Sequence, residues 1–209
     1  MLSRRHFVSG SAAVMVAGTA ITIAPRRALA APAADGPWSG KLVRAAESQI
    51  GVTTLYDAAY SRLDYPGGDV SRERGVCTDV VVRAYRDGLG IDLQKLVHED
   101  MKRAFSAYPG LWGLKSTDRN IDHRRVPNLR IFFQRRGSAL PVTTEAAAYK
   151  PGDIVSQVLA NGLPHIAIVS DRMNDAGATP LVIHNIGRGT LAEDILFALK
   201  ITGHYRFSG

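Results

Sequence analysis

The chain has 209 residues, and 26 Lys and Arg against 19 Asp and Glu give it a net charge of +7. One cysteine excludes an internal disulfide, and the length suits a single domain with a substantial core. The positive charge is modest and no nucleic-acid-binding motif is present, so nucleic acid is not an expected partner.

The first thirty residues have the pattern of an export signal. Arg4-Arg5 forms a twin-arginine motif, an apolar run extends from Val8 to Ala24, and Ala28-Leu29-Ala30 resembles a cleavage site. The alternative is an N-terminal membrane anchor, but the run is rich in small residues and weakly hydrophobic for a span. We expect a twin-arginine signal peptide over 1–30, recognition by the twin-arginine export machinery, and a periplasmic protein without an integral membrane span after cleavage.

Removal of that signal changes the interpretation of the charge. The signal contains four arginines and no acidic residue, which leaves 22 basic against 19 acidic residues and a net charge of +3. A short Ala/Pro linker is expected over 31–37, followed by one domain over 38–209. In an oxidising compartment a lone thiol is a liability unless it is buried or used, so Cys77 is the first candidate functional residue.

Apolar side chains at helical spacing dominate the first part of the domain. They predict helices over 38–50, 77–86, 93–107 and 128–135, with one or two helical turns over 56–63. Ser39 and Asp92 are the expected N-caps of the first and third helices. Tyr65 to Asp69 and the polar stretch 108–127 are expected to be loops.

The apolar pattern becomes strand-like after Pro151. Strands are predicted over 153–159, 165–169, 181–184 and 199–207, and Asn161-Gly162 predicts a hairpin between the first two. Helices followed by an antiparallel sheet indicate the α+β class.

Cys77 lies at the predicted start of a helix. The unpaired N–H groups there favour a thiolate and can lower the pKa of the thiol. Gly75 would let the chain turn sharply and bring the sulfur to the surface. The alternative is a small cysteine buried in the core.

His165 begins an apolar strand directly after Pro164, where it could reach a helix N-terminus at the edge of the sheet. A third polar group is then needed to orient the imidazole. His184 and Asn185, on the next strand, are both candidates. A structural histidine is the alternative.

The order of these features resembles the NlpC-type cell-wall cysteine peptidases, a branch of the papain-like superfamily. The matching features are the helix-initial Cys77, Pro151 to Val155, the strand that begins at His165, and His184 after an apolar residue. The resemblance implies a papain-like fold with helices packed on a small antiparallel sheet. It also implies Cys77 as nucleophile, His165 as base and His184 as the orienting residue, with no cofactor or metal.

A narrower resemblance, to an uncharacterised bacterial family of unknown function, extends from about residue 38 to the end. It is carried by residues 75–81, 120–129 and 201–206. Cell-wall peptidases usually have Asp-Cys-Ser-Gly at the nucleophile, whereas here the residues are Val76-Cys77-Thr78-Asp79. Asp79 could cap the helix or contact substrate, and a carboxylate close to the sulfur would oppose thiolate formation.

Further residues are candidates for binding substrate. Tyr65, before Gly67-Gly68, and Tyr56 are both candidates for an oxyanion-stabilising hydroxyl, together with the N–H of Cys77. Asp122, His123 and Arg124 lie in a polar segment that is either a solvated loop or a substrate rim, where an arginine could bind a carboxylate.

These features predict a cysteine hydrolase that cleaves an amide bond, with peptidoglycan stem peptides as the expected substrate. The alternatives are an ester or thioester hydrolase or acyltransferase on the same fold, and a non-catalytic cell-wall-binding domain. The scattered histidines lack the ligand spacing of a zinc hydrolase.

Overall fold

The computed structural model describes residues 36–209. The predicted signal over 1–30 and most of the predicted linker lie outside this range. Four α-helices and a six-stranded antiparallel sheet in the described part form a mixed α+β fold, which confirms the predicted class. None of the helices between residues 36 and 209 has the length and apolar character needed to cross a membrane.

The helices lie close to their predicted positions. They are α1 (Pro37–Glu47), α2 (Cys77–Leu89), α3 (Leu93–Arg103) and α4 (Val126–Arg135). Asp92 accepts hydrogen bonds from the N–H groups of Gln94 and Lys95, which confirms it as the N-cap of α3. The expected cap at Ser39 is wrong, because Gly36 is the N-cap of α1 and the Ser39 hydroxyl donates to its carbonyl.

Two helix predictions need further correction. α3 ends at Arg103, four residues earlier than expected, and a separate short 3₁₀ turn, η1 (Phe105–Ala107), follows it. The helical turns expected over 56–63 are absent, and this segment continues from strand β1 (Leu55–Tyr56) without regular secondary structure. The physical reason is that Arg124 binds the carbonyls of Asp57 and Ala59 that a helix would use internally.

The main sheet has the strand order β3-β8-β4-β5-β6-β7, and every pair is antiparallel. The strands are β3 (Ala139–Leu140), β4 (Ile154–Val158), β5 (Pro164–Met173), β6 (Pro180–Asn185), β7 (Thr190–Glu193) and β8 (Lys200–Tyr205). The hairpin predicted at Asn161-Gly162 joins β4 to β5, and Gly162 there has the left-handed φ of +81°. The short edge strands β3 and β7 were not predicted.

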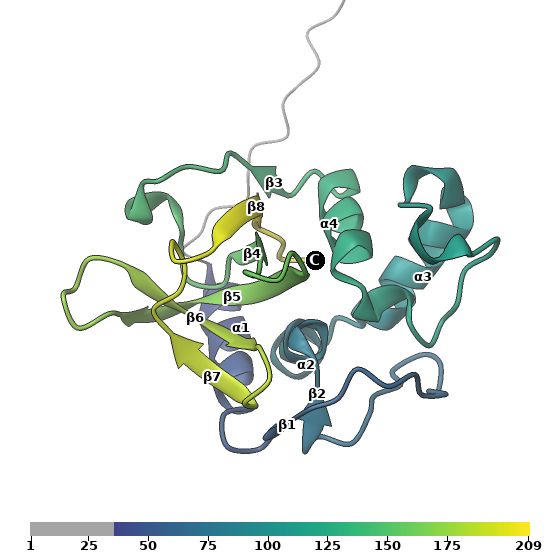
Figure 1. The fold of residues 1–209 in the computed structure, drawn as a ribbon, viewed down its shortest axis with the longest axis horizontal. Helices are drawn as coiled ribbons and strands as arrows, with labels where there is room; N and C mark the ends of the chain where they lie inside the picture. The colour runs from purple at the N-terminus through teal and green to yellow at the C-terminus, as the bar shows by residue number, and fades with distance from the viewer. Residues whose placement is uncertain (1–35) are drawn as a thin grey trace, which may run out of the picture.

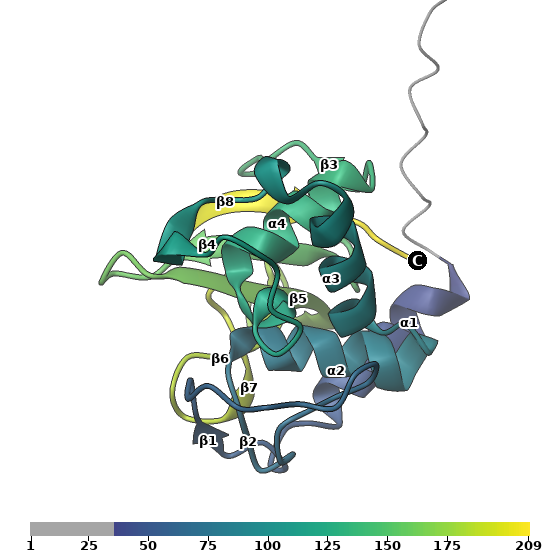
Figure 2. The same ribbon diagram turned by 90° about the vertical axis from the view of Figure 1, so that its right-hand side faces the viewer.

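Helices cover one face of the sheet. α1, α2 and α4 contact it directly, while α3 packs outside them, and Figures 1 and 2 show this layering. β5 separates two cores: Ile166 and Ile168 pack with α2, whereas Ala167 and Val169 pack with Tyr149 on the other face. This arrangement places the beginning of α2 beside the beginning of β5.

A fully buried arginine organises the long segment that precedes α2. The Arg83 guanidinium binds both carboxylate oxygens of Asp69 and the carbonyls of Val70, Ser71 and Arg74. These contacts fix the short strand β2 (Arg74–Gly75), which pairs in parallel with β1. The chain therefore enters α2 from a rigid position.

Candidate active site

Cys77 is the first residue of α2 and lies in the wall of a pocket of about 250 Å³. The pocket is lined by Tyr56, Ala58, Val76, Cys77, Trp112, Ile121, Arg124, Arg125, Val126, Pro127 and Pro164. Only 5% of Cys77 is exposed. The residue is therefore reached through this pocket. Pro164, the first residue of β5, lines the same pocket.

Burial controls the protonation of the cysteine. It raises the pKa of the Cys77 thiol to about 12, although the backbone N–H groups of Ile166 and Thr78 act in the opposite direction. The lowered pKa expected from the helix N-terminus is therefore wrong, because desolvation of the thiolate outweighs the N–H groups. The contribution from Ile166 also shows that the sulfur lies beside β5, one residue after His165.

Asp79 caps the helix on which the cysteine lies. One of its carboxylate oxygens accepts a hydrogen bond from the N–H of Val76 at 2.7 Å. Its two oxygens also accept from Nε and Nη2 of Arg124, at 2.8 and 2.9 Å, in a buried bidentate pair. Asp79 and Arg124 therefore fix the start of α2. Arg124 also lines the pocket, so its expected contact with a substrate carboxylate stays a prediction, although Asp79 already neutralises its charge.

Gly75 is required for close packing rather than for a turn. The sharp turn expected here does not bring the sulfur to the surface, because Cys77 is buried, and the φ of Gly75 is not in the left-handed region. A Cβ at this position would lie 3.0 Å from the Asp79 carboxylate and 3.2 Å from Nη1 of Arg83. A larger residue here would therefore disturb both buried ion pairs that hold the start of α2.

His165, on β5, and His184, on β6, form an edge-to-face pair. Their ring centroids are 5.1 Å apart at an interplanar angle of 84°. Both rings are 1% exposed, and Nε2 of His165 has no hydrogen-bond partner. Burial, and then His184, lower the pKa of His165 to about 3, so the ring is neutral. No hydrogen bond joins His165 to Cys77 in the described residues.

The next residue outward from this pair is Glu193, on β7. Its Oε2 lies 3.1 Å from Nε2 of His184, without hydrogen-bonding alignment, and its Oε1 accepts from Arg188 at 2.8 Å. Burial lowers the pKa of His184, and the Glu193 charge opposes that shift. Sequence analysis missed Glu193 because β7 has only four residues and no clear alternation.

Asn185 does not face the histidine pair. Its side-chain N–H group donates to the carbonyl of Gly75 at 3.0 Å, and its side-chain oxygen accepts from the N–H of Gly187. Both groups of this amide are occupied in tying β6 to the segment that enters α2. His184 is therefore the neighbour of His165, and Asn185 is a buried structural link.

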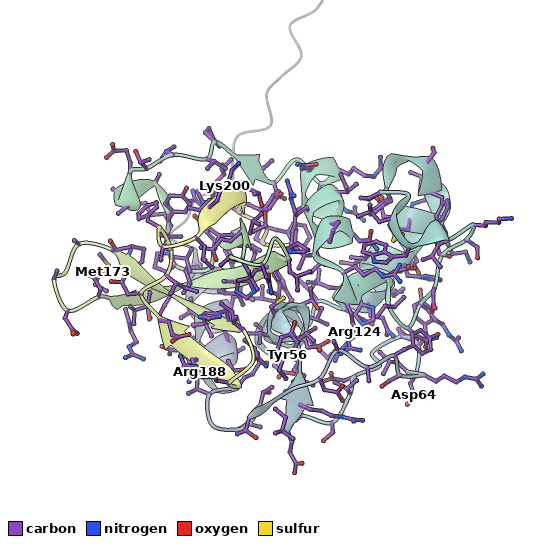
Figure 3. All side chains as sticks on the ribbon, viewed as in Figure 1. Tyr56, Asp64, Arg124, Met173, Arg188 and Lys200 are labelled. Atoms are coloured by element: carbon purple, nitrogen blue, oxygen red, sulfur yellow. The ribbon has the colours of Figure 1, made fainter. Side chains whose placement is uncertain are left out.

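The two tyrosine candidates are separated by the fold. Tyr56 lies in the pocket wall, and burial, followed by the Cys77 and Asp79 charges, raises the pKa of its hydroxyl. Figure 3 shows Tyr56 and Arg124 near each other, with Asp64 farther out. Tyr65 instead packs edge-on against His98, with centroids 5.2 Å apart, away from the pocket lining.

The segment expected to be a solvated loop or a rim is largely buried. Asp122 accepts from the N–H of Asp118 and lies 3.0 Å from Nδ1 of His98, and its side chain has no exposure. His123 is 2% exposed, and burial lowers its pKa to about 3. Neither residue lines the Cys77 pocket. Arg125 and Trp112, which do, were not singled out from the sequence.

Metal-binding side chains do not gather at this site. Across residues 36–209, no group of three or more His, Cys, Asp or Glu side chains is placed to hold a metal ion.

Comparison with known proteins places the chain in a family. Residues 43–207 match the family described as "Domain of unknown function (DUF1287)", and the chain belongs to it. A protein of Escherichia coli (strain K12), described as "Uncharacterized protein YijF", is 56% identical over 162 residues, which cover 78% of each chain. This membership agrees with the narrower resemblance noted in the sequence, and neither description contains an activity.

Proposed function

We propose that this protein is a papain-like cysteine hydrolase of the NlpC type, with Cys77 as nucleophile and His165 as base. One observation carries the proposal. The Cys77 sulfur lies at a helix N-terminus in a pocket wall, beside strand β5, whose second residue is the buried His165 with an unpartnered Nε2. A buried polar atom without a hydrogen-bond partner lowers the stability of the folded protein. A role of the His165 Nε2 in proton transfer would explain why it is kept unpartnered.

The protonation states suggest how the reaction begins. A thiol with a raised pKa and an imidazole with a lowered pKa are both neutral at pH 7. His165 therefore takes the thiol proton as sulfur attacks the carbonyl carbon, rather than holding a preformed thiolate. The proton then passes from His165 to the leaving amine, and the acyl group stays on sulfur until water releases it.

Groups around the pocket fit the remaining roles. The Cys77 N–H at the start of α2 and the Tyr56 hydroxyl are the candidates for stabilising the oxyanion. The edge of His184 orients the His165 ring, and Glu193 holds His184 from the other side. Arg124 and Asp79 act indirectly, because they fix the start of α2 and the Asp57–Ala59 backbone after Tyr56.

The proposed substrate is an amide bond in peptidoglycan stem peptides, and the proposed location is the periplasm. The support comes from the twin-arginine pattern and the resemblance to cell-wall peptidases. Purified peptidoglycan should be digested by the wild-type protein and not by Cys77→Ala, with new amino and carboxyl ends in the released muropeptides. Identical muropeptide profiles for the two proteins would reject this substrate.

An ester or thioester hydrolase is the second candidate, and a specific cavity favours it. A larger pocket of about 500 Å³ lies between the β4–β5 hairpin and β7. Its walls include Leu159, Ile186, Leu191, Ile195 and Leu199, and Glu193 borders it. An acyl chain would suit such a lining. Release of a fatty acid, with unchanged muropeptides, would identify this activity.

A further inference from the structure

The Cys77 pocket contains two arginines in different electrostatic situations. Arg124 is neutralised by the buried carboxylate of Asp79. Arg125 forms no ion pair with any residue in the range 36–209, and its Nη1 is buried without a hydrogen-bond partner. The pocket therefore has one half-buried cation with no ion pair in the described part of the chain, and only the more distant charges of Asp122 and Asp118 act on it.

Trp112 holds that cation in place. The Arg125 guanidinium lies over the Trp112 ring, with its central carbon 4.0 Å from the ring centroid. Trp112 has a φ of +70°, and it is the one non-glycine residue with positive φ among those described. Backbone strain of this kind occurs where a side chain must be presented in a fixed direction. Half of Trp112 is exposed, so the stack faces the open side of the pocket.

Two helices begin at the same pocket. α2 starts at Cys77 and α4 starts at Val126, directly after its N-cap Arg125, and all three residues line the pocket. Helix N-termini carry a partial positive charge and favour anions. The charge of α2 is partly offset by Asp79, but the first turn of α4 contains no acidic residue. The positive end of α4 therefore adds to the charge of Arg125.

We propose that Arg125, held on Trp112 at the start of α4, binds a carboxylate of the ligand that occupies the Cys77 pocket. This inference rests on the proposed function for the position of the scissile bond, but binding itself requires no catalysis. A planar guanidinium matches a carboxylate with two parallel hydrogen bonds. The substrate class is thus an acyl compound with a free carboxylate close to the bond that is cleaved.

The test uses Cys77→Ala protein, in which no hydrolysis by Cys77 can occur. The chain has two tryptophans, so Trp38→Phe leaves Trp112 as the emitter. The fluorescence of Trp112 is titrated with N-acetyl-Ala-Glu, with its diamide and with inorganic phosphate at constant ionic strength. We expect the acid to bind about tenfold or more tightly than the diamide and than phosphate.

Variants at Arg125 test whether this residue binds the carboxylate. Arg125→Gln should abolish the preference for the acid, and Arg125→Lys should retain part of it. The inference would be overturned if the acid does not bind, or if the diamide or phosphate binds as tightly as the acid. It would also be overturned if Arg125→Gln keeps the preference for the acid. A preference for the acid in a protein whose wild type hydrolyses nothing would keep the inference and remove the proposed hydrolase.

Discussion

The carboxylate of Asp79 and the guanidinium of Arg124 form a bidentate pair directly beneath the cysteine at the start of α2. The two side chains are 4% and 2% exposed. They join three separate segments, because Asp79 also binds the Val76 N–H and Arg124 also binds the carbonyls of Asp57 and Ala59. The pair therefore determines where both Cys77 and Tyr56 lie.

A double-mutant cycle should reveal this coupling. Asp79→Leu alone leaves a buried cation without a partner and should cost about 3–5 kcal/mol of unfolding free energy. Asp79→Leu with Arg124→Met removes both charges and should recover much of that loss. Chemical denaturation measures all four proteins. Additive effects of the two changes would contradict a direct interaction.

Arg83 should be the main stabiliser of the segment before α2. Arg83→Gln leaves several carbonyls and the Asp69 carboxylate without their donor, and should cost roughly 3 kcal/mol. Arg72→Gln is the matched control, because Arg72 lies near the same carboxylate but is 48% exposed, and should cost under about 1 kcal/mol. Comparable losses in the two variants would show that the burial of Arg83 is not decisive.

The buried neutral histidines make stability depend on pH. The pKa of His165 and of His123 is lowered to about 3 in the folded protein. As the pH falls below about 6.5, these residues take up protons in the unfolded chain but not in the folded one. Stability should therefore fall from pH 6.5 towards 4.5, by on the order of 1 kcal/mol per pH unit for each histidine.

His123→Gln provides the comparison, because it removes one titrating group outside the proposed catalytic set. Unfolding free energies of the variant and the wild type should converge as the pH falls. Parallel curves between pH 4.5 and 6.5 would mean that His123 is not held neutral by the fold.

Glu193 should act through His184. Glu193→Gln removes the charge that raises the pKa of His184, so NMR should show this histidine titrating at lower pH. Turnover should fall about tenfold with little change in KM, against about 100-fold or more for His165→Gln. Arg188→Gln is the comparison, because Arg188 contacts Glu193 from the exposed side, is itself 78% exposed and lowers the pKa of His184, so its removal should shift the His184 titration to higher pH. An unchanged His184 titration in Glu193→Gln would remove this positioning role.

Local patterns predicted the elements that carry the candidate site. Helical spacing located α2, the Pro164-His165 pair located the start of β5, and Asp92 was identified as a cap because capping depends on neighbouring residues. The α+β class follows from the order of these patterns.

The parts that were missed depend on contacts between distant segments. Arg124 binds Asp79 across 45 residues, and this contact makes a buried network of a segment that was expected to be a solvated loop or a substrate rim. The same arginine binds the carbonyls of Asp57 and Ala59, so the chain after Tyr56 does not form the helical turns that its local pattern favoured. Burial also reversed the expected direction of the Cys77 pKa, since sequence shows a helix start but not the depth at which it lies. Arg125 on Trp112 requires a left-handed tryptophan that no pattern predicts.

Acylation of the folded protein by a small activated ester tests whether Cys77 is a nucleophile assisted by His165. p-Nitrophenyl acetate is small enough for the 250 Å³ pocket and requires no knowledge of the true substrate. We expect a burst of one nitrophenolate per protein, an acetyl group on Cys77 by mass spectrometry, and a burst about 100-fold slower in His165→Gln. Acetylation of Cys77 only after unfolding would show that the thiol is not a nucleophile in the folded protein, and equally fast acetylation in His165→Gln would show that His165 is not its base.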